Sequence, residues 1–161
     1  MLKFHSYDIV FREIPDETTL AINIAGCPNR CAGCHSPHLQ EETGQPLTGT
    51  VLSLLLERYG AAVTCVCFMG GDAEPDEVVK LARDVQNMPT LRLKTAWYSG
   101  RNNIPDGALT AFDYIKLGAY VEALGGLDAK TTNQRFYTVE KQQITDITNK
   151  FFNSNYYAKK D

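Results

Sequence analysis

Residues 19–34 have the sequence TLAINIAGCPNRCAGC, in which an apolar segment from Thr19 to Gly26 runs directly into three cysteines. The segment is rich in strand-forming residues and ends in glycine, a pattern that is typical of a buried strand followed by a loop. The cysteines at positions 27, 31 and 34 are therefore expected on a loop at the end of a strand.

Strands and helices are expected to alternate after the cysteine loop. Further strands are expected at 63–69, 91–97 and 114–117. Helices are expected at 50–59, 76–86 and 108–112. Because a helix follows each strand, the strands should pair in parallel. An additional edge strand or hairpin is expected at 7–11, and a terminal helix at 145–152.

This order of elements predicts an α/β fold. About four or five βα units are too few to close an eight-stranded barrel, so we expect a partial, open TIM-type barrel with mostly parallel strands. A length of 161 residues suits one compact core, and we expect a single domain over residues 1–161. Ligand sites in such folds lie at the carboxyl ends of the strands.

Composition and charge exclude several classes of partner. Hydrophobic residues make up 43% of the chain and charged residues 22%, as in ordinary globular proteins. The net charge of -3 gives no basic field for phosphates, so no nucleic-acid partner is expected. No apolar run approaches the roughly 20 residues that span a bilayer, and the start of the chain lacks the apolar core of a signal peptide. We expect a cytoplasmic protein without a membrane partner.

The cysteines favour a metal centre. The chain has five, and the three at positions 27, 31 and 34 lie within eight residues, which suits metal ligation better than a disulfide framework. A structural zinc site is normally closed by four ligands, whereas a cubane iron–sulfur cluster on three cysteines keeps one iron open for a ligand. An open iron predicts chemistry at the cluster.

Other interpretations of the cysteines remain open. His35, His38 or Cys65 could complete a zinc site, or the three residues could be buried thiols. Cys65 and Cys67 alternate onto one face of a strand, where core burial is the favoured interpretation and a disulfide or second metal site the alternative.

A second motif follows the strand at 63–69. Gly70, Gly71 and Asp72 form either a turn or a place where the backbone approaches a ligand closely. The proximity of the cysteine loop, expected at the neighbouring strand end, favours the second interpretation.

The CxxxCxxC spacing of Cys27, Cys31 and Cys34 resembles the signature of the radical S-adenosylmethionine superfamily, and residues 70–72 resemble its GGE-type element with aspartate in place of glutamate. The resemblance implies a radical SAM type of barrel, one [4Fe-4S] cluster and S-adenosyl-L-methionine bound at the open iron. Reductive cleavage of that cofactor would give methionine and a 5'-deoxyadenosyl radical. His35 could be an additional ligand or a packed neighbour.

Nearly the whole chain also resembles the activating components of anaerobic, class III ribonucleotide reductases. This resemblance rests on residues 7–10, 27–35, 69–72, 97–100 and 132–135. It implies that the radical abstracts hydrogen from a glycine of the large reductase subunit, which leaves a glycyl radical. A reduced flavodoxin or ferredoxin-type protein would supply the electron. Two departures from the family pattern are residues 13–17, in place of a Gly-rich turn, and Leu117, in place of an acidic residue.

The resemblance also assigns the site residues. The cluster ligands are Cys27, Cys31 and Cys34, and the cofactor-binding residues are Gly33, Cys34, His35, Gly70, Gly71, Asp72, Ser99, Asn133 and Gln134. No side chain beyond the cluster and cofactor is expected to be catalytic. Asn133 and Gln134 could line the cofactor site or fix a loop. Rival functions are activation of another glycyl-radical enzyme, a small-molecule radical enzyme, a ferredoxin-like electron carrier and a zinc-binding adaptor.

Overall fold

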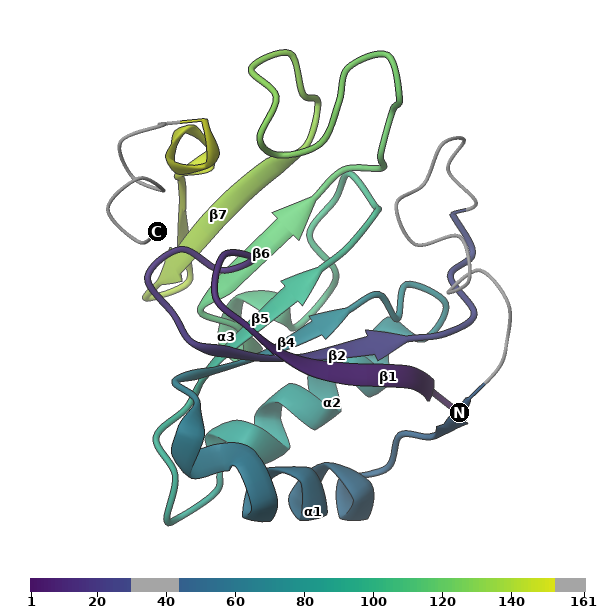
Figure 1. Ribbon diagram of the computed structural model, residues 1–161, viewed down its shortest axis with the longest axis vertical. Helices are drawn as coiled ribbons and strands as arrows, with labels where there is room; N and C mark the ends of the chain where they lie inside the picture. The colour runs from purple at the N-terminus through teal and green to yellow at the C-terminus, as the bar shows by residue number, and fades with distance from the viewer. Residues whose placement is uncertain (30–43, 153–161) are drawn as a thin grey trace.

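One sheet of eight strands organises the protein, and it appears in Figure 1 with the helices beneath it. The computed structural model describes residues 1–29 and 44–152. The strands are β1 (Lys3–Val10), β2 (Thr19–Ile24), β3 (Gln45–Pro46), β4 (Cys65–Met69), β5 (Lys94–Tyr98), β6 (Tyr114–Leu117), β7 (Arg135–Glu140) and β8 (Gln143–Asp146). The helices are α1 (Gly49–Tyr59), α2 (Pro75–Gln86), α3 (Ala108–Ala111) and the short 3-10 helices η2 (Gly60–Ala62) and η3 (Thr148–Phe151).

The middle of the sheet confirms the predicted α/β class. Strands β2, β4, β5 and β6 are neighbours and run parallel, with Thr19 opposite Cys65 and Asn23 opposite Met69 in the first pair. Each of α1, α2 and α3 begins and ends within one residue of its expected range. Parallel strands need such crossover connections, and these helices supply them.

Both flanks of the sheet are antiparallel, so the expectation of mostly parallel strands holds only for the middle. The order is β3-β1-β2-β4-β5-β6-β7-β8, and among the described residues the two outer strands do not pair with each other. The sheet is therefore open. Strand β1 pairs antiparallel with β2, and β7 and β8 form a hairpin after β6.

The predicted terminal helix at 145–152 is wrong. Its first residues belong to β8, and only η3 follows. The hairpin turns at Lys141 and Gln142, whose φ values of 51° and 63° are the left-handed conformation that a tight two-residue turn requires. Neither residue is a typical turn former, so the sequence contained little sign of this hairpin.

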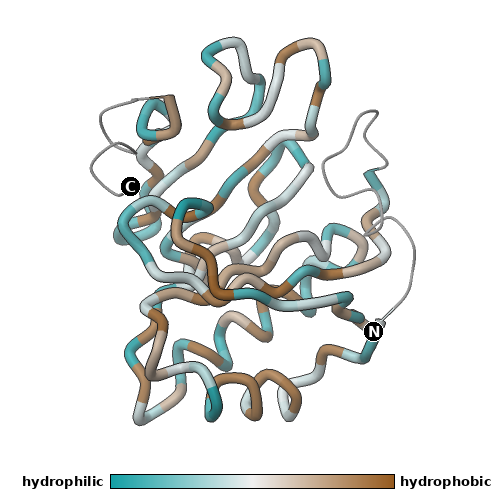
Figure 2. The backbone as a smooth tube through the Cα atoms, viewed as in Figure 1, coloured by the Kyte–Doolittle hydropathy of each residue, from teal (hydrophilic) through white to brown (hydrophobic). Residues whose placement is uncertain are grey.

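The helices cover one face of the sheet through their apolar sides. Thr48 caps α1, since its hydroxyl accepts a hydrogen bond from the Val51 backbone N–H at 3.2 Å. Pro75 starts α2, and five apolar residues of this helix are buried. Figure 2 shows hydrophobic residues along the central strands and on α1. No helix within the described ranges is long and apolar enough to cross a membrane.

The opposite, inner face of the sheet is covered by the segment at 11–18 and by η3. Ile14 is fully buried there, in a cluster with Cys65, Cys67 and Phe151. Residues 13–17, which stand in place of the expected Gly-rich turn, thus cover the inner face of the sheet.

The same segment is also fixed by polar contacts. Glu17 is 8% exposed and accepts hydrogen bonds from the hydroxyls of Tyr114 at 2.7 Å and Thr64 at 2.8 Å. Lys94 forms an ion pair with the same carboxylate at 3.2 Å. The Tyr98 hydroxyl donates to the carbonyl of Glu13. These contacts hold the segment against β4, β5 and β6.

Candidate functional site

Cys27 lies just beyond the carboxyl end of β2, where Gly26 turns the chain with a φ of 75°. Its side chain is partly exposed. The other predicted ligands, Cys31 and Cys34, lie outside the described residues, as do the predicted cofactor-binding residues Gly33 and His35.

The Gly70-Gly71 turn lies beside the start of the cysteine loop, because β4 pairs in parallel with β2. Gly70 and Gly71 have φ values of 109° and 93°, which side chains disfavour. A Cβ atom on Gly70 would lie 3.2 Å from the Ile24 carbonyl oxygen. The Trp97 indole N–H donates to the Gly70 carbonyl at 2.8 Å and fixes the turn from β5. Glycine is thus required for the close approach of β4 to the end of β2.

Asp72 connects three segments of the site. Its carboxylate is buried and accepts a hydrogen bond from the Ser99 hydroxyl at 2.6 Å and from the Gly100 backbone N–H at 2.8 Å. The Asn29 side-chain amide donates to it at 2.6 Å. Asp72 therefore joins the ends of β4 and β5 to the cysteine loop. The structure brings the predicted residues Asp72 and Ser99 together, and it adds Asn29, which the sequence analysis did not single out.

Lys116 is a buried cation that the sequence analysis also missed. It is 8% exposed, and its ammonium group donates to the carbonyls of Ser99 at 3.2 Å and Gly118 at 2.9 Å. The same group lies 5.7 Å from the centre of the Tyr98 ring, a cation–π distance. The one available signal was a lysine within the apolar strand YIKL, where a charge is costly unless it is satisfied.

A cavity of about 460 Å³ opens on the inner face of the sheet. Met69, Tyr98, Lys116 and Gln134 are among the residues that line it. This volume falls within the range of small-molecule pockets, roughly 300–1,000 Å³. The lining combines aromatic and aliphatic surface with charged side chains of both signs, which are Arg12, Lys116, Glu13 and Asp128.

The predicted residues Asn133 and Gln134 hold the loop after β6. The Gln134 side-chain amide donates to the Gly118 carbonyl at 3.3 Å, and that of Asn133 donates to the Ala119 carbonyl at 3.1 Å. Gln134 is buried and lines the inner cavity, whereas Asn133 is exposed. Both residues therefore fix a loop, and their predicted role in binding the cofactor stays a prediction.

Cys65 and Cys67 are core residues, as the favoured interpretation predicted. Both are fully buried and unbridged. Burial raises the pKa of each thiol, and for Cys65 the charge of Glu17 raises the pKa further. Because metal ligands and reactive cysteines are thiolates, raised pKa values disfavour a second metal site here.

Cys65 also lies too far away to complete a zinc site with Cys27. It pairs with Thr19 at the amino end of β2, whereas Cys27 follows the carboxyl end. A strand of this length separates its ends by roughly 16 Å.

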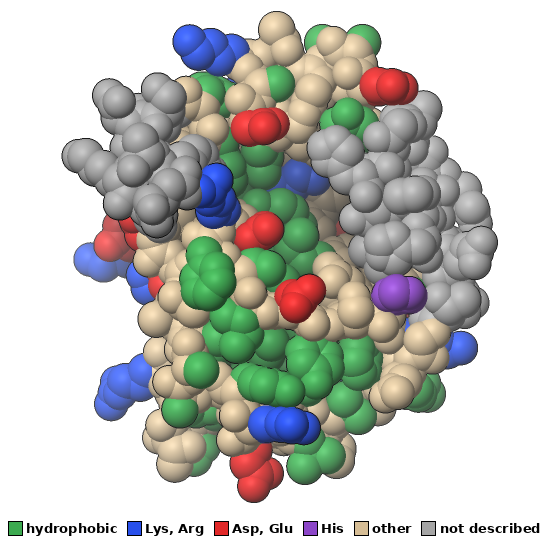
Figure 3. Space-filling view, viewed as in Figure 1, with side chains coloured by type: hydrophobic (Ala, Val, Ile, Leu, Met, Phe, Trp, Pro, Cys, Tyr) green, Lys and Arg blue, Asp and Glu red, His purple; other side chains and the backbone are tan. Residues whose placement is uncertain are grey.

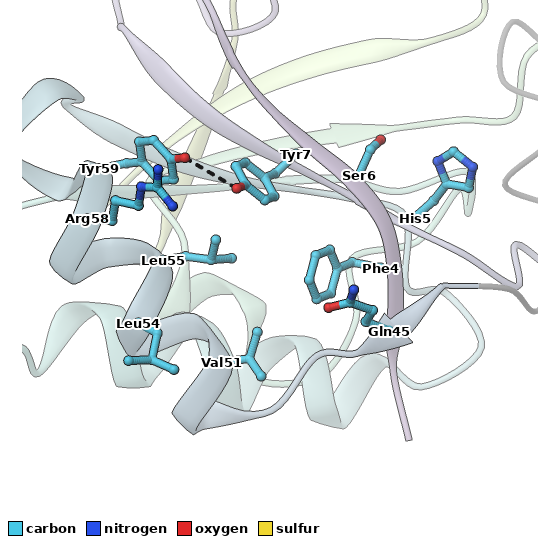
Figure 4. Close-up of a pocket in the computed structure, with 10 residues that line it drawn as sticks. All are labelled: Phe4, His5, Ser6, Tyr7, Gln45, Val51, Leu54, Leu55, Arg58 and Tyr59. Atoms are coloured by element: carbon cyan, nitrogen blue, oxygen red, sulfur yellow. Dashed lines mark hydrogen bonds between the residues drawn. The ribbon is translucent and has the colours of Figure 1, made fainter.

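An outer groove of about 560 Å³ lies between β1 and α1 (Figure 4). The hydroxyls of Tyr7 and Tyr59, which both line the groove, form a hydrogen bond of 3.3 Å. This hydrogen bond raises the pKa of Tyr7. Figure 3 shows hydrophobic side chains gathered over this region, to which Val51, Leu54 and Leu55 contribute. None of the cluster-ligating or cofactor-binding residues predicted from the sequence is among those that line this groove.

The residues around Cys27 fit a thiolate ligand. The Asn29 amide nitrogen lies 3.6 Å from the Cys27 sulfur and 2.6 Å from Asp72, so its two hydrogens meet two acceptors if the sulfur is a thiolate. Within 1–29 and 44–152, no three His, Cys, Asp or Glu side chains converge as a metal site. Two of the three proposed ligands lie outside those ranges.

No protein-family model matches the chain, and no curated protein or solved structure does so either. Its function is therefore inferred from its own residues and their geometry.

Proposed function

We propose that the protein is a radical S-adenosylmethionine enzyme that generates the glycyl radical of an anaerobic ribonucleotide reductase. Cys27, Cys31 and Cys34 would hold one [4Fe-4S] cluster. When bound, the cluster and S-adenosylmethionine would supply one-electron reductive cleavage, which releases methionine and converts the adenosyl part to 5'-deoxyadenosine by taking hydrogen from a glycine of the large reductase subunit. A reduced flavodoxin or ferredoxin-type protein would donate the electron in a cytoplasmic setting.

One observation carries the proposal. Asn29, two residues after Cys27, donates to Asp72, which is the acidic residue of the Gly-Gly-Asp element. Two motifs that are 43 residues apart in the sequence are thus in direct contact at the carboxyl ends of adjacent parallel strands. Ligand sites of α/β folds lie at this edge of the sheet.

The proposal includes an open TIM-type barrel. Its support is the parallel run of β2, β4, β5 and β6, with helices on one face and an inner cavity on the other. Three crossovers join these strands, far fewer than a closed barrel of eight requires.

The chain's own residues would bind and orient the cofactor. Gly70 is partly exposed beside the cysteine loop, and its N–H and carbonyl are hydrogen-bonded to Tyr98 and Trp97, so the turn would give the cofactor site its shape and not free backbone groups. A carboxylate can accept roughly four hydrogen bonds, and Asp72 already accepts three from protein groups. Its main role is therefore to hold the cysteine loop. Lys116 contributes a positive charge to the inner cavity, whose lining also contains Glu13 and Asp128, so a ligand there would meet charges of both signs.

Cofactor cleavage tests the proposal directly. The protein is reconstituted with iron and sulfide without oxygen and mixed with dithionite and S-adenosylmethionine, and 5'-deoxyadenosine is measured by chromatography. We expect product from the wild-type protein. A fully assembled cluster that yields no 5'-deoxyadenosine would exclude radical chemistry and favour an electron carrier.

The ligand set is tested by the iron content of matched cysteine variants. Cys27→Ala and Cys31→Ala should abolish cluster assembly, because a cubane held by three cysteines loses an anchor. Cys67→Ala is the control, since this thiol is buried in the core. Equal loss of iron in all three variants would show that the ligand set is wrong.

The protein substrate is tested by electron paramagnetic resonance. The reduced enzyme is mixed with S-adenosylmethionine and the large subunit of an anaerobic ribonucleotide reductase, and the doublet of a glycyl radical is recorded. If 5'-deoxyadenosine forms but no doublet appears, the enzyme activates a different glycyl-radical protein or acts on a small molecule.

A further inference from the structure

Asn29 lies between the sulfur of Cys27 and the carboxylate of Asp72. Its amide nitrogen is 3.6 Å from the sulfur and 2.6 Å from the nearer carboxylate oxygen. A carboxylate accepts hydrogen bonds only, so the nitrogen of the amide, and not its oxygen, faces Asp72. The second hydrogen of the same nitrogen is then available to Cys27.

The surroundings fix the orientation of this amide. Asp72 is held from the other side by the Ser99 hydroxyl and the Gly100 N–H, so the oxygen that Asn29 contacts has a defined position. A Cβ atom on Gly100 would lie 2.4 Å from the Asn29 nitrogen. Only glycine at position 100 leaves room for the amide. Two independent features therefore accommodate Asn29: the fixed carboxylate of Asp72 and the absence of a side chain at Gly100.

We infer that Asn29 is a positioning residue that sets how easily the iron–sulfur centre is reduced, by donating a hydrogen bond to the Cys27 thiolate while Asp72 holds its amide in place. This inference rests on the proposed function. Hydrogen bonds to cluster sulfurs are among the factors that determine reduction potential. A donor stabilises the reduced state, which has one more negative charge, so Asn29 raises the potential.

Asp72 acts in the opposite direction through its charge. Because the carboxylate oxygen and the sulfur contact the same nitrogen, they are at most about 6 Å apart, where an anion disfavours the added electron. The two residues thus form a matched pair, in which one favours reduction and the other opposes it.

The test is a redox titration of the reconstituted wild-type protein and two variants, followed by electron paramagnetic resonance. Asn29→Ala should shift the potential to a more negative value, with a roughly three- to tenfold lower ratio of reduced to oxidised cluster at a fixed solution potential. Asp72→Asn should shift it to a more positive value, since the amide keeps the acceptor for Asn29 and Gly100 but loses the charge. A merely structural role would not move the two potentials in opposite directions.

Asn23→Ala is the matched control. Asn23 lies on β2, the strand that precedes the cysteine loop, and donates to the Ser6 hydroxyl at 3.0 Å, so its loss removes a comparable side-chain hydrogen bond. We expect its potential to equal that of the wild type. If the wild type assembles a cluster and Asn29→Ala has the wild-type potential, the inference is wrong and the proposed function stands.

Two further outcomes are also decisive. If Asn29→Ala cannot retain iron, the Asp72→Asn titration decides, and an unchanged or more negative potential overturns the inference. If the wild type itself assembles no cluster, the proposed function fails together with the inference.

Discussion

Gly71 has no space for a side chain. A Cβ atom there would lie 2.4 Å from the Val78 side chain and 3.3 Å from that of Ile24. The φ of 93° adds a conformational cost for any other residue. The turn after β4 thus depends on glycine for packing as well as for backbone geometry.

Gly71→Ala should lower the free energy of unfolding by about 2–4 kcal/mol, from a left-handed backbone and from overpacking against α2. Denaturant titration measures the change. Gly49→Ala is the control, because this glycine begins α1 without a positive φ and its new methyl group would meet only the flexible end of Asp84. A similar loss in both variants would contradict this account.

Single residues were predictable to different degrees. Asp72 could be assigned to the site because an acidic residue after a glycine pair at a strand end is a recognisable pattern. Asn29 could not, since asparagine is common in loops and its partners come from segments far away in the sequence. Lys116 was missed because an apolar strand usually excludes charge, and the carbonyls that its ammonium group contacts come from outside that strand.

The elements near the carboxyl end depend on one carboxylate. Asp146 of β8 accepts from the Arg135 side chain of β7 at 2.7 Å and from the backbone N–H of Thr148 at 2.9 Å. Burial alone would raise the pKa of Asp146, but the hydrogen bonds from Arg135 and Thr148 together lower it. The ionised form therefore connects the hairpin to η3.

Asp146→Ala should lower the free energy of unfolding by about 1 kcal/mol near neutral pH. Because the pKa is lower in the folded protein, this contribution is complete above the unfolded value of about 3.8 and is lost as the pH falls through the folded value. Wild type and variant should therefore converge in stability as the pH falls through the lowered pKa of Asp146. Thermal melts from pH 7 to pH 2.5 measure this, and a constant difference would show that the charge is irrelevant.

Helices were easier to predict than the carboxyl-terminal strands, for physical reasons. The helix α1 has a side-chain cap at Thr48, and α2 has Pro75 at its start and apolar residues at helical spacing. The β7–β8 hairpin turns at Lys141 and Gln142, residues that adopt left-handed φ only because the surrounding pairing holds them there. Tertiary contacts, and not the local sequence, therefore determine the β7–β8 hairpin.

The molecule has helices on one face of its sheet and a loop segment on the other. The segment at 11–18 contains Arg12, Glu13, Asp16 and Glu17, so its composition resembles a solvent-exposed loop. The burial of Ile14 and Glu17 reveals that it closes the inner face. The sequence could therefore predict the α/β layer but not what covers its inner side.

Ile14→Ala should lower the free energy of unfolding by about 2–5 kcal/mol, because it leaves a cavity in the inner core. It should also increase the binding of a dye that recognises exposed apolar surface. Phe11→Ala is the control in the same segment, since Phe11 is 62% exposed and its loss should cost less than about 0.5 kcal/mol. Equal effects of the two changes would mean that the segment does not close the core.

Trp97 is the single tryptophan of the chain, and it is fully buried with its indole hydrogen bond directed at the Gly70 carbonyl. Its fluorescence therefore originates from one known position, in contact with the turn that is proposed to receive the cofactor. A ligand that moves this turn should change the wavelength or intensity of emission. The protein thus contains an intrinsic optical reporter for its own candidate site, and binding can be titrated without a label.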